Sequence, residues 1–87
     1  IVASARRQLT TGLEELGLSP FPSATNFVSV KLPVLASSVA KEMLEKGVQI
    51  HAWPDPGFRN FIRITVGRPD DNDACLKALS EVLRGKP

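Results

Sequence analysis

An alternating stretch near the C-terminal end places the strongest limit on how this chain can fold. In residues 60–67, the aliphatic side chains Ile62, Ile64 and Val66 alternate with polar or aromatic ones. Successive side chains of a strand point to opposite faces, so the three aliphatic residues would share one face and Arg63 would lie on the other. The stretch therefore predicts a strand that holds an arginine at its middle.

The residues after this strand predict a tight turn and a helix. Gly67 allows the backbone to turn sharply, and Pro69 suits the first helical position. Asp70 and Asp71 follow, and carboxylates in the first turn favour the positive end of the helix dipole. Strand, turn and helix are thus expected in direct succession.

The rest of the chain contains two further helical patterns and two further strand patterns. Apolar residues recur at helical spacing in residues 1–16 and 36–44, and Gly17 and Gly47 are suited to end these helices. Residues 26–32 and 48–53 alternate as strands do. Prolines make residues 19–23 a stiff extended connector, and residues 55–57 a turn.

This order, helix, strand, helix, strand, strand, helix, predicts an α/β (α+β) fold in one domain, residues 1–87. We expect a two-layer sandwich with helices on one face of a small three-stranded sheet, mixed or antiparallel. The strands that contain Asn26 and Arg63 are expected to pair. Eighty-seven residues give only a small core.

If the aliphatic side chains face the helices, the other face of the sheet is unusually rich in aromatic and basic residues. Such a face is typical of an interface, although a short helix of the same chain could also cover it. An arginine there can bind a carboxylate or phosphate through its planar fork, or form an ion pair with Asp55. Asn26 could lie near a substrate or bond its own backbone. The residues predicted on this face are Phe27, Ser29, His51, Trp53, Phe61, Arg63 and Thr65.

Composition excludes several classes of function. The net charge of +2, with scattered Lys and Arg, does not predict a nucleic-acid surface, and no apolar run is long enough to span a membrane. One cysteine, Cys75, cannot form an internal disulfide, which favours a cytoplasmic protein. One histidine and one cysteine exclude the usual zinc clusters, so no metal is expected.

Two motifs resemble those of histidinol-phosphate aminotransferases and related fold-type I, pyridoxal-phosphate-dependent aminotransferases. Residues 62–67, followed by Pro69 and the acidic residues 70–73, resemble the signature near the C-terminus of that family. Residues 22–28 resemble its Pro-Ser-x-x-Asn-Phe run, in the expected order. Residues 47–51 resemble a glycine-led strand of the family, which usually ends in arginine where this chain has His51.

The resemblance implies a small C-terminal domain whose larger partner domain precedes it. In the family, the strand arginine, here Arg63, anchors the acidic group of the substrate, and His51 occupies the position of a second anion-binding arginine. The cofactor, pyridoxal 5'-phosphate, and its Schiff-base lysine would belong to the absent large domain, so this chain alone is expected to be inactive. The implied partners are a small amino-acid or phosphate-ester substrate, the large domain and, as is usual in the family, a second copy of the full-length protein.

Three alternatives to a histidinol-phosphate aminotransferase remain open. A histidine side chain is not a permanent cation, whereas a phosphate ester favours two permanent cations. The full-length protein could therefore be an aromatic or other amino-acid transaminase, or an amino-acid-phosphate decarboxylase. The short chain could also be a separate α/β module that binds a ligand or a partner.

Overall fold

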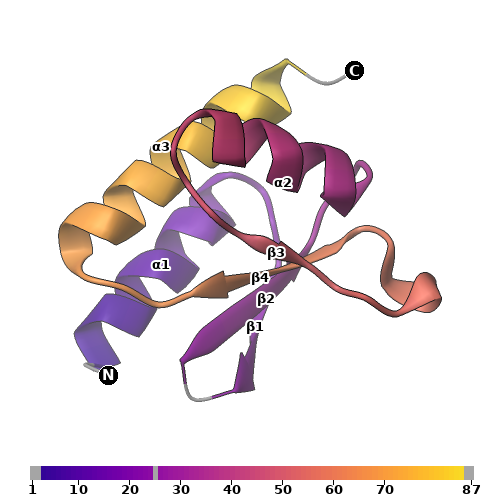
Figure 1. Ribbon diagram of the computed structural model, residues 1–87. Coiled ribbons are helices and arrows are strands. Elements are labelled where there is room, and N and C mark those ends of the chain that lie inside the picture. Colours follow the sequence, from indigo (N-terminus) through magenta and orange to yellow (C-terminus); the bar gives the residue numbers. More distant parts are fainter. Residues whose placement is uncertain (1–2, 25, 86–87) are drawn as a thin grey trace.

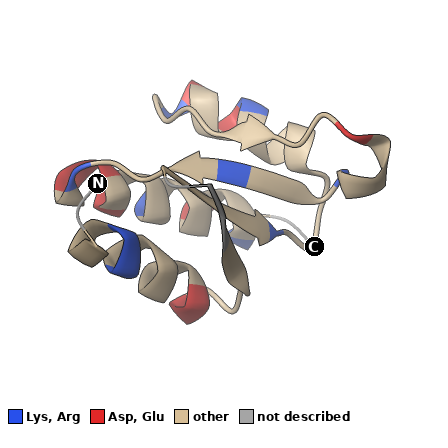
Figure 2. Ribbon diagram, turned by 90° about the horizontal axis from the view of Figure 1, so that it is seen from below, with Lys and Arg blue, Asp and Glu red and all other residues tan. Residues whose placement is uncertain are grey.

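The computed structural model describes residues 3–24 and 26–85, which form three helices and a four-stranded antiparallel sheet (Figure 1). The helices lie on one side of the sheet, and most charged residues lie on helices and loops rather than on strands (Figure 2). The elements in chain order are α1 (Ala3–Glu15), β1 (Pro20–Ala24), β2 (Phe27–Lys31), α2 (Ala36–Glu45), β3 (His51–Ala52), a short 3₁₀ helix η1 (Pro56–Phe58), β4 (Phe61–Thr65) and α3 (Pro69–Arg84).

The strand order is β1-β2-β4-β3, so β2 and β4 form the centre of the sheet. Five residues of β2 pair with five of β4, with Ser29 opposite Arg63. Backbone hydrogen bonds extend this pair at both ends, from Val66 N to Asn26 O at 2.8 Å and from Leu32 N to Asn60 O. The predicted pairing of the strands that contain Asn26 and Arg63 is therefore confirmed.

The prediction of three strands was wrong, because the proline-rich segment is itself a strand. Residues 19–23 were expected to be an extended connector, but Pro20–Ala24 forms β1 and pairs with β2, with Phe21 opposite Ser29. The extended backbone was correctly predicted from the prolines. A proline cannot donate to a sheet ladder, yet it is tolerated on an edge strand, and β1 lies at the edge. The element order is thus helix, two strands, helix, two strands, helix.

The strand predicted at residues 48–53 is shorter than expected. Strand β3 comprises only His51–Ala52, which pairs with β4, and a hydrogen bond from Trp53 N to Phe61 O at 3.1 Å follows it. The preceding residues instead complete the end of α2, where Gly47 has φ +84° and Val48 N donates to Met43 O at 2.9 Å. This hydrogen bond turns the backbone away from the sheet before residue 51.

The same type of helix end occurs after α1. Gly17 has φ +84°, a conformation in which other residues are strained, and Leu18 N donates to Leu13 O at 3.1 Å. The prediction that Gly17 ends the first helix is confirmed. The first two residues of the predicted helix lie outside the described residues, and α1 begins at Ala3.

The core lies between the sheet and the three helices, as the alternation of β2 and β4 predicts. Both aliphatic sets, Val28, Val30 and Leu32, and Ile62, Ile64 and Val66, are buried, together with residues of every α-helix. Cys75 is buried in the same core, and this burial raises the pKa of its thiol from 9.0 to about 11. Within the described ranges, no helix is long and apolar enough to cross a membrane.

A buried amide, Asn72, joins the turn after β4 to helix α1. Asn72 is 1% exposed; its Oδ1 accepts from Gly67 N at 3.0 Å. Its Nδ2 lies within hydrogen-bond distance of Gly67 O (3.2 Å), Ala5 O (3.2 Å) and Gln8 Oε1 (3.0 Å). Gln8 Nε2 in turn donates to Asp73 Oδ1 at 2.9 Å. This amide network fixes α1 against the first turn of α3.

The network also explains how α3 begins without a conventional cap. Arg68 is the N-cap residue, and its side chain makes no capping hydrogen bond. Pro69 occupies the first turn, as expected, together with Asp70 and Asp71. Asn72 satisfies the backbone groups of Gly67 immediately before the helix, so the turn is held by a side chain from inside α3.

We expect Asn72→Ala to destabilise the domain by about 2–4 kcal/mol, because it leaves several buried polar groups without partners. The matched control is Asn26→Ala at an exposed position, which should change stability by at most about 0.5 kcal/mol. Urea unfolding followed by circular dichroism measures both. Equal unfolding midpoints for the two variants would contradict the role of the network.

Candidate anion-binding face

The side of the sheet that faces away from the helices carries the candidate site. We call it the open face, and it is defined by the side chains of Phe21, Phe27, Ser29, Lys31, His51, Trp53, Phe61, Arg63 and Thr65. These positions alternate with the buried core positions of the same strands, so the core packing determines which residues lie here. The structure thus places every predicted face residue on one surface and adds Phe21 and Lys31.

His51 and Arg63 are direct cross-strand neighbours on this face. His51 on β3 lies opposite Arg63 on β4, and Arg63 lies opposite Ser29 on β2. Side chains directly opposite each other in an antiparallel pair have Cβ atoms about 4.5–5.5 Å apart. Both His51 and Arg63 are exposed. The two residues predicted to bind an anion therefore lie side by side and accessible.

The guanidinium of Arg63 stacks on an aromatic ring. Its Cζ lies 4.4 Å from the centroid of the Phe27 ring. The ion pair with Asp55 that the sequence left open is not formed. Among the described residues, Arg63 makes no hydrogen bond or ion pair, so its N–H donors are available to a ligand.

An aromatic cluster occupies the part of the open face next to this pair. Phe61 contacts the rings of Phe21, Trp53 and Phe58, with centroid distances of 6.2, 6.0 and 5.2 Å. Phe58 belongs to η1 and stacks on Trp53 at 4.9 Å. The alternative in which a short helix of the same chain covers the face thus holds at its Trp53 end. His51, Arg63 and Thr65 remain exposed.

Two buried polar atoms on the open face have no partner. Ser29 is 0% exposed, and neither its Oγ nor the Trp53 Nε1 makes a hydrogen bond. Buried polar groups are almost always paired, so these two atoms are exceptions among the described residues.

The other polar candidates lie outside the row formed by His51 and Arg63. Arg59 and Arg68 are exposed beyond opposite ends of β4, several residues from Arg63 along the strand. Asn26 is exposed at the start of β2. Its backbone carbonyl accepts a hydrogen bond from Val66 N, which extends the pairing of β2 with β4 and is no evidence for ligand binding. The position of Phe58 on this face was not predicted, because a proline-glycine turn does not specify where the next aromatic residue will pack.

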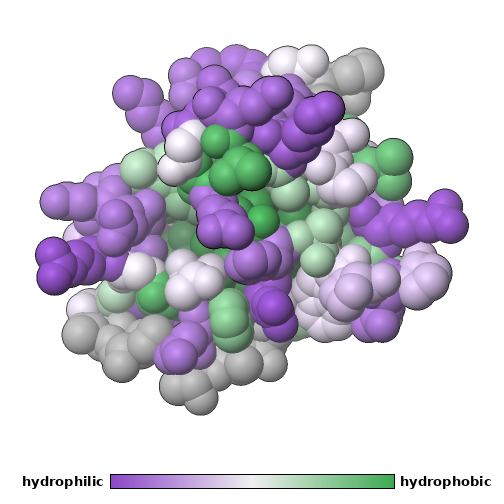
Figure 3. All heavy atoms as spheres, in the orientation of Figure 1, coloured by the Kyte–Doolittle hydropathy of each residue, from purple (hydrophilic) through white to green (hydrophobic). Residues whose placement is uncertain are grey.

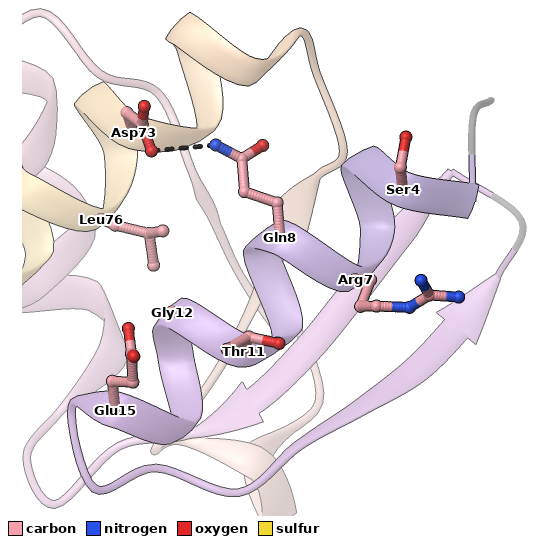
Figure 4. Close-up of a pocket in the computed structure, with 8 residues that line it drawn as sticks. All are labelled: Ser4, Arg7, Gln8, Thr11, Gly12, Glu15, Asp73 and Leu76. Atoms are coloured by element: carbon pink, nitrogen blue, oxygen red, sulfur yellow. Dashed lines mark hydrogen bonds between the residues drawn. The ribbon is translucent and has the colours of Figure 1, made fainter.

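A second hollow, between α1 and α3, does not have the character of a ligand site. Its polar lining includes Gln8 and Asp73, which bond each other across the two helices (Figure 4). The Arg7 side chain points away from Asp73 in the same view. Gln8 and Asp73 thus join the two helices and are not free to bind a ligand.

The described part of the chain does not fit a pyridoxal-phosphate site. Such a site needs a lysine that is desolvated in a pocket, where its amine becomes nucleophilic. All four described lysines, Lys31, Lys41, Lys46 and Lys77, are exposed. Within residues 3–24 and 26–85, no group of three or more His, Cys, Asp or Glu side chains could hold a metal ion either.

Apolar surface is also visible on the helix side of the molecule. In the view of Figure 3, apolar residues gather around the C-terminal part of α2 and are surrounded by hydrophilic ones. Leu44 in that helix is 61% exposed. The surface there has no cationic row or unpaired buried donor, so the open face remains the candidate site.

The fold is a four-stranded antiparallel sheet whose open face carries Arg63, and a family comparison gives the class of the protein. Residues 1–79 match the family described as aminotransferase class I and II. The chain therefore belongs to the class I and II aminotransferases.

The most similar relatives that we compared carry one name. The histidinol-phosphate aminotransferase of Brevibacillus brevis is 38% identical over 79 residues, which cover 91% of this chain and 22% of that protein. The one of Halalkalibacterium halodurans is 41% identical over 76 residues, 87% of this chain and 21% of that protein. This chain thus spans about a fifth of the length of these relatives.

A solved structure shares the fold. The crystal structure of histidinol-phosphate aminotransferase from Sinorhizobium meliloti, in complex with pyridoxal-5'-phosphate, superposes with a TM-score of 0.84 at 29% identity. The match covers 98% of this chain and 24% of that chain. The arrangement of three helices on a four-stranded sheet is thus that of one part of a larger aminotransferase.

We expect the 87-residue chain to bind no stoichiometric pyridoxal phosphate, because its described lysines are all exposed. Titration with the cofactor, followed by its visible absorbance after gel filtration, measures this. An equimolar, borohydride-sensitive absorbance that remains with the protein would contradict the expectation. Exposed surface lysines that react slowly would give only a substoichiometric signal.

Proposed function

We propose that this chain is the small C-terminal domain of a pyridoxal-phosphate-dependent aminotransferase and supplies the clamp for the anionic group of its substrate. The observation that carries this proposal is the placement of His51 directly opposite Arg63 on the open face. The substrate class that fits best is an amino-alcohol phosphate such as histidinol phosphate, whose amino group passes to a 2-oxo acid. The relatives at about 40% identity carry that name.

Arg63 performs the main binding step. Its planar guanidinium offers two parallel N–H donors to a phosphate or carboxylate, and such charge-assisted bonds are about twice as strong as neutral ones. The rigid strand β4 fixes the Cα of Arg63, and β2 and β3 flank it on both sides. A fixed anchor orients the amino group of the substrate relative to groups held elsewhere in the protein.

His51 supplies a second donor whose charge depends on pH. A protonated imidazole donates two hydrogen bonds and adds a positive charge beside Arg63. A phosphate ester, with close to two negative charges, benefits from this second cation more than a carboxylate does. The row of Arg63 and His51 can therefore hold either anion, with a preference for phosphate when the imidazole is charged.

The rest of the full-length protein would hold the cofactor, which supplies the stabilisation of negative charge on the substrate carbon. The large domain would lie against the open face, where the aromatic cluster favours a covering partner. The proposal includes a homodimer of the full-length protein in the cytoplasm. The isolated chain would have no activity.

A second candidate substrate class is an aromatic or other amino acid held by its carboxylate. One permanent cation, Arg63, and the rings of Phe61 and Trp53 on the same face favour it. An amino-acid-phosphate decarboxylase would use the same clamp. A separate binding module is less consistent with this chain, because residues 1–79 match an enzyme family.

In the full-length protein, Arg63→Lys keeps the positive charge but loses the planar fork. We expect kcat/KM for histidinol phosphate to fall, with 2-oxoglutarate as acceptor. The fall should correspond to a loss of about 1.5–3 kcal/mol of transition-state stabilisation. Arg59→Lys, outside the His51 row, is the matched control and should leave kcat/KM close to the wild-type value. Unchanged kinetics of Arg63→Lys would reject the clamp.

His51 distinguishes the two substrate classes. His51→Arg places a permanent cation beside Arg63, so KM for histidinol phosphate should fall in this variant. KM for phenylalanine should change little in the same variant.

The alternative outcome is equally specific. If His51→Arg changes KM for histidinol phosphate and for phenylalanine by the same factor at every pH, His51 does not meet a phosphate group, and the plain amino-acid class is favoured. His51→Gln serves as the uncharged control, and it should not lower KM for histidinol phosphate as His51→Arg does.

A further inference from the structure

The feature that the proposed clamp leaves unexplained is the aromatic ring beneath Arg63. Phe27 lies on β2 opposite Thr65, two pairs along from the pair formed by Ser29 and Arg63 and on the same face. It is therefore a diagonal neighbour of Arg63, within reach of a long side chain. The Arg63 guanidinium uses this reach and lies over the ring, with Cζ 4.4 Å from the centroid.

This contact leaves the binding edge of Arg63 free. A guanidinium is flat, its hydrogen-bond donors point outward in its plane, and its faces are the weakly hydrated parts. Stacking on Phe27 uses a face, whereas bidentate capture of a phosphate or carboxylate uses an edge. The ring can thus hold the side chain in place while the N–H donors bind a ligand.

The ring is also a firmer support than any other group near Arg63. Phe27 is partly buried on a central strand of the sheet, so its own position is determined by the pairing of β2 with β4. In the described part of the chain, no carboxylate pairs with Arg63, and the side chain opposite it, Ser29, is short and makes no hydrogen bond. The Phe27 ring is the contact that restricts where Arg63 points.

We propose that Phe27 is the positioning residue that aligns the Arg63 guanidinium for the anionic group of the substrate. This proposal rests on the proposed function of Arg63. It adds that removal of the Phe27 ring should lower the affinity for the substrate. An exposed arginine has many rotamers, and ordering them on binding weakens affinity; a stacked arginine has lost part of that freedom beforehand. The ring thereby raises affinity without touching the substrate.

The test compares ring-deleting and ring-keeping variants in the full-length protein. Phe27→Leu should raise KM for histidinol phosphate about 3- to 30-fold, the range of a cation–π contact, and leave kcat little changed. KM alone should respond because the anion is held equally in the ground state and in the transition state. Phe27→Tyr keeps the ring and should restore KM to near the wild-type value.

Two controls separate positioning from general damage to the sheet. Leu44→Ala removes an apolar side chain of α2 that is 61% exposed and lies outside the open face, and should leave KM unchanged. In an Arg63→Gln background, Phe27→Leu should cause no further rise in KM. If Phe27→Leu does not fold by circular dichroism, Phe27→Met replaces it as an apolar side chain without a ring.

The outcomes distinguish this inference from the clamp itself. If Arg63→Lys impairs kcat/KM but Phe27→Leu behaves like Leu44→Ala, the positioning role is rejected and the clamp stands. If Arg63→Lys has no effect, the clamp is rejected and the positioning role is rejected with it. A rise in KM for Phe27→Leu that is reversed in Phe27→Tyr and absent from the Arg63→Gln background supports the inference.

Discussion

The hydrogen bonds of Asn72 are the interaction on which the rest of this small structure depends. The side chain is almost completely buried, and its donors and acceptor all have partners, on the turn after β4 and on α1. A buried amide is costly unless it is fully satisfied, so α1, the turn and α3 must come together in one arrangement. That arrangement orients β4, the strand that carries Arg63, relative to the helices. A core of this size has few other specific polar contacts that could do so.

The position of the candidate site follows from the packing of β2 and β4. Each strand has aliphatic residues at every second position, and these residues are buried under the helices. The remaining positions must face the other way, which brings His51, Arg63 and Ser29 into one row across three strands. A shift of one residue in the register would expose the aliphatic side chains and bury Arg63. The stability of the core and the geometry of the clamp are therefore maintained by the same pairing.

The sequence predicts the elements that have strong periodic or terminal signals. The alternation of β4, the helix-ending Gly17 and Gly47, and Pro69 at the start of α3 are local features, and the structure agrees with each. The shared face of His51 and Arg63 was also predictable, because alternation alone assigns side chains to faces. Their role in binding a substrate remains a prediction that the enzyme kinetics must test.

The features that were missed depend on contacts between distant parts of the chain. The prolines correctly predicted extended backbone at residues 20–22. The local sequence does not show that this segment pairs with β2. The short β3 results from the hydrogen bond of Val48 to Met43, which competes with pairing to β4. The burial of Asn72 and the packing of Phe58 on Trp53 arise only when separate elements meet. Local periodicity does not predict such tertiary contacts.

The prolines of β1 have a consequence for how this protein behaves among other chains. In an edge strand, alternate residues point their backbone groups away from the sheet, and an unpaired row of N–H groups can recruit a strand from a neighbouring molecule. Pro20 and Pro22 are two residues apart, so their backbone groups point to the same edge of β1, and neither has an N–H group. The backbone groups of Phe21, which lies between them, point to the other edge and can pair with β2. The outer edge of β1 is thus poor in donors. At the opposite edge of the sheet, β3 is only two residues long. Neither edge of the sheet is therefore a good template for aggregation. This limits the risk of aggregation during synthesis, which the aromatic open face would otherwise raise.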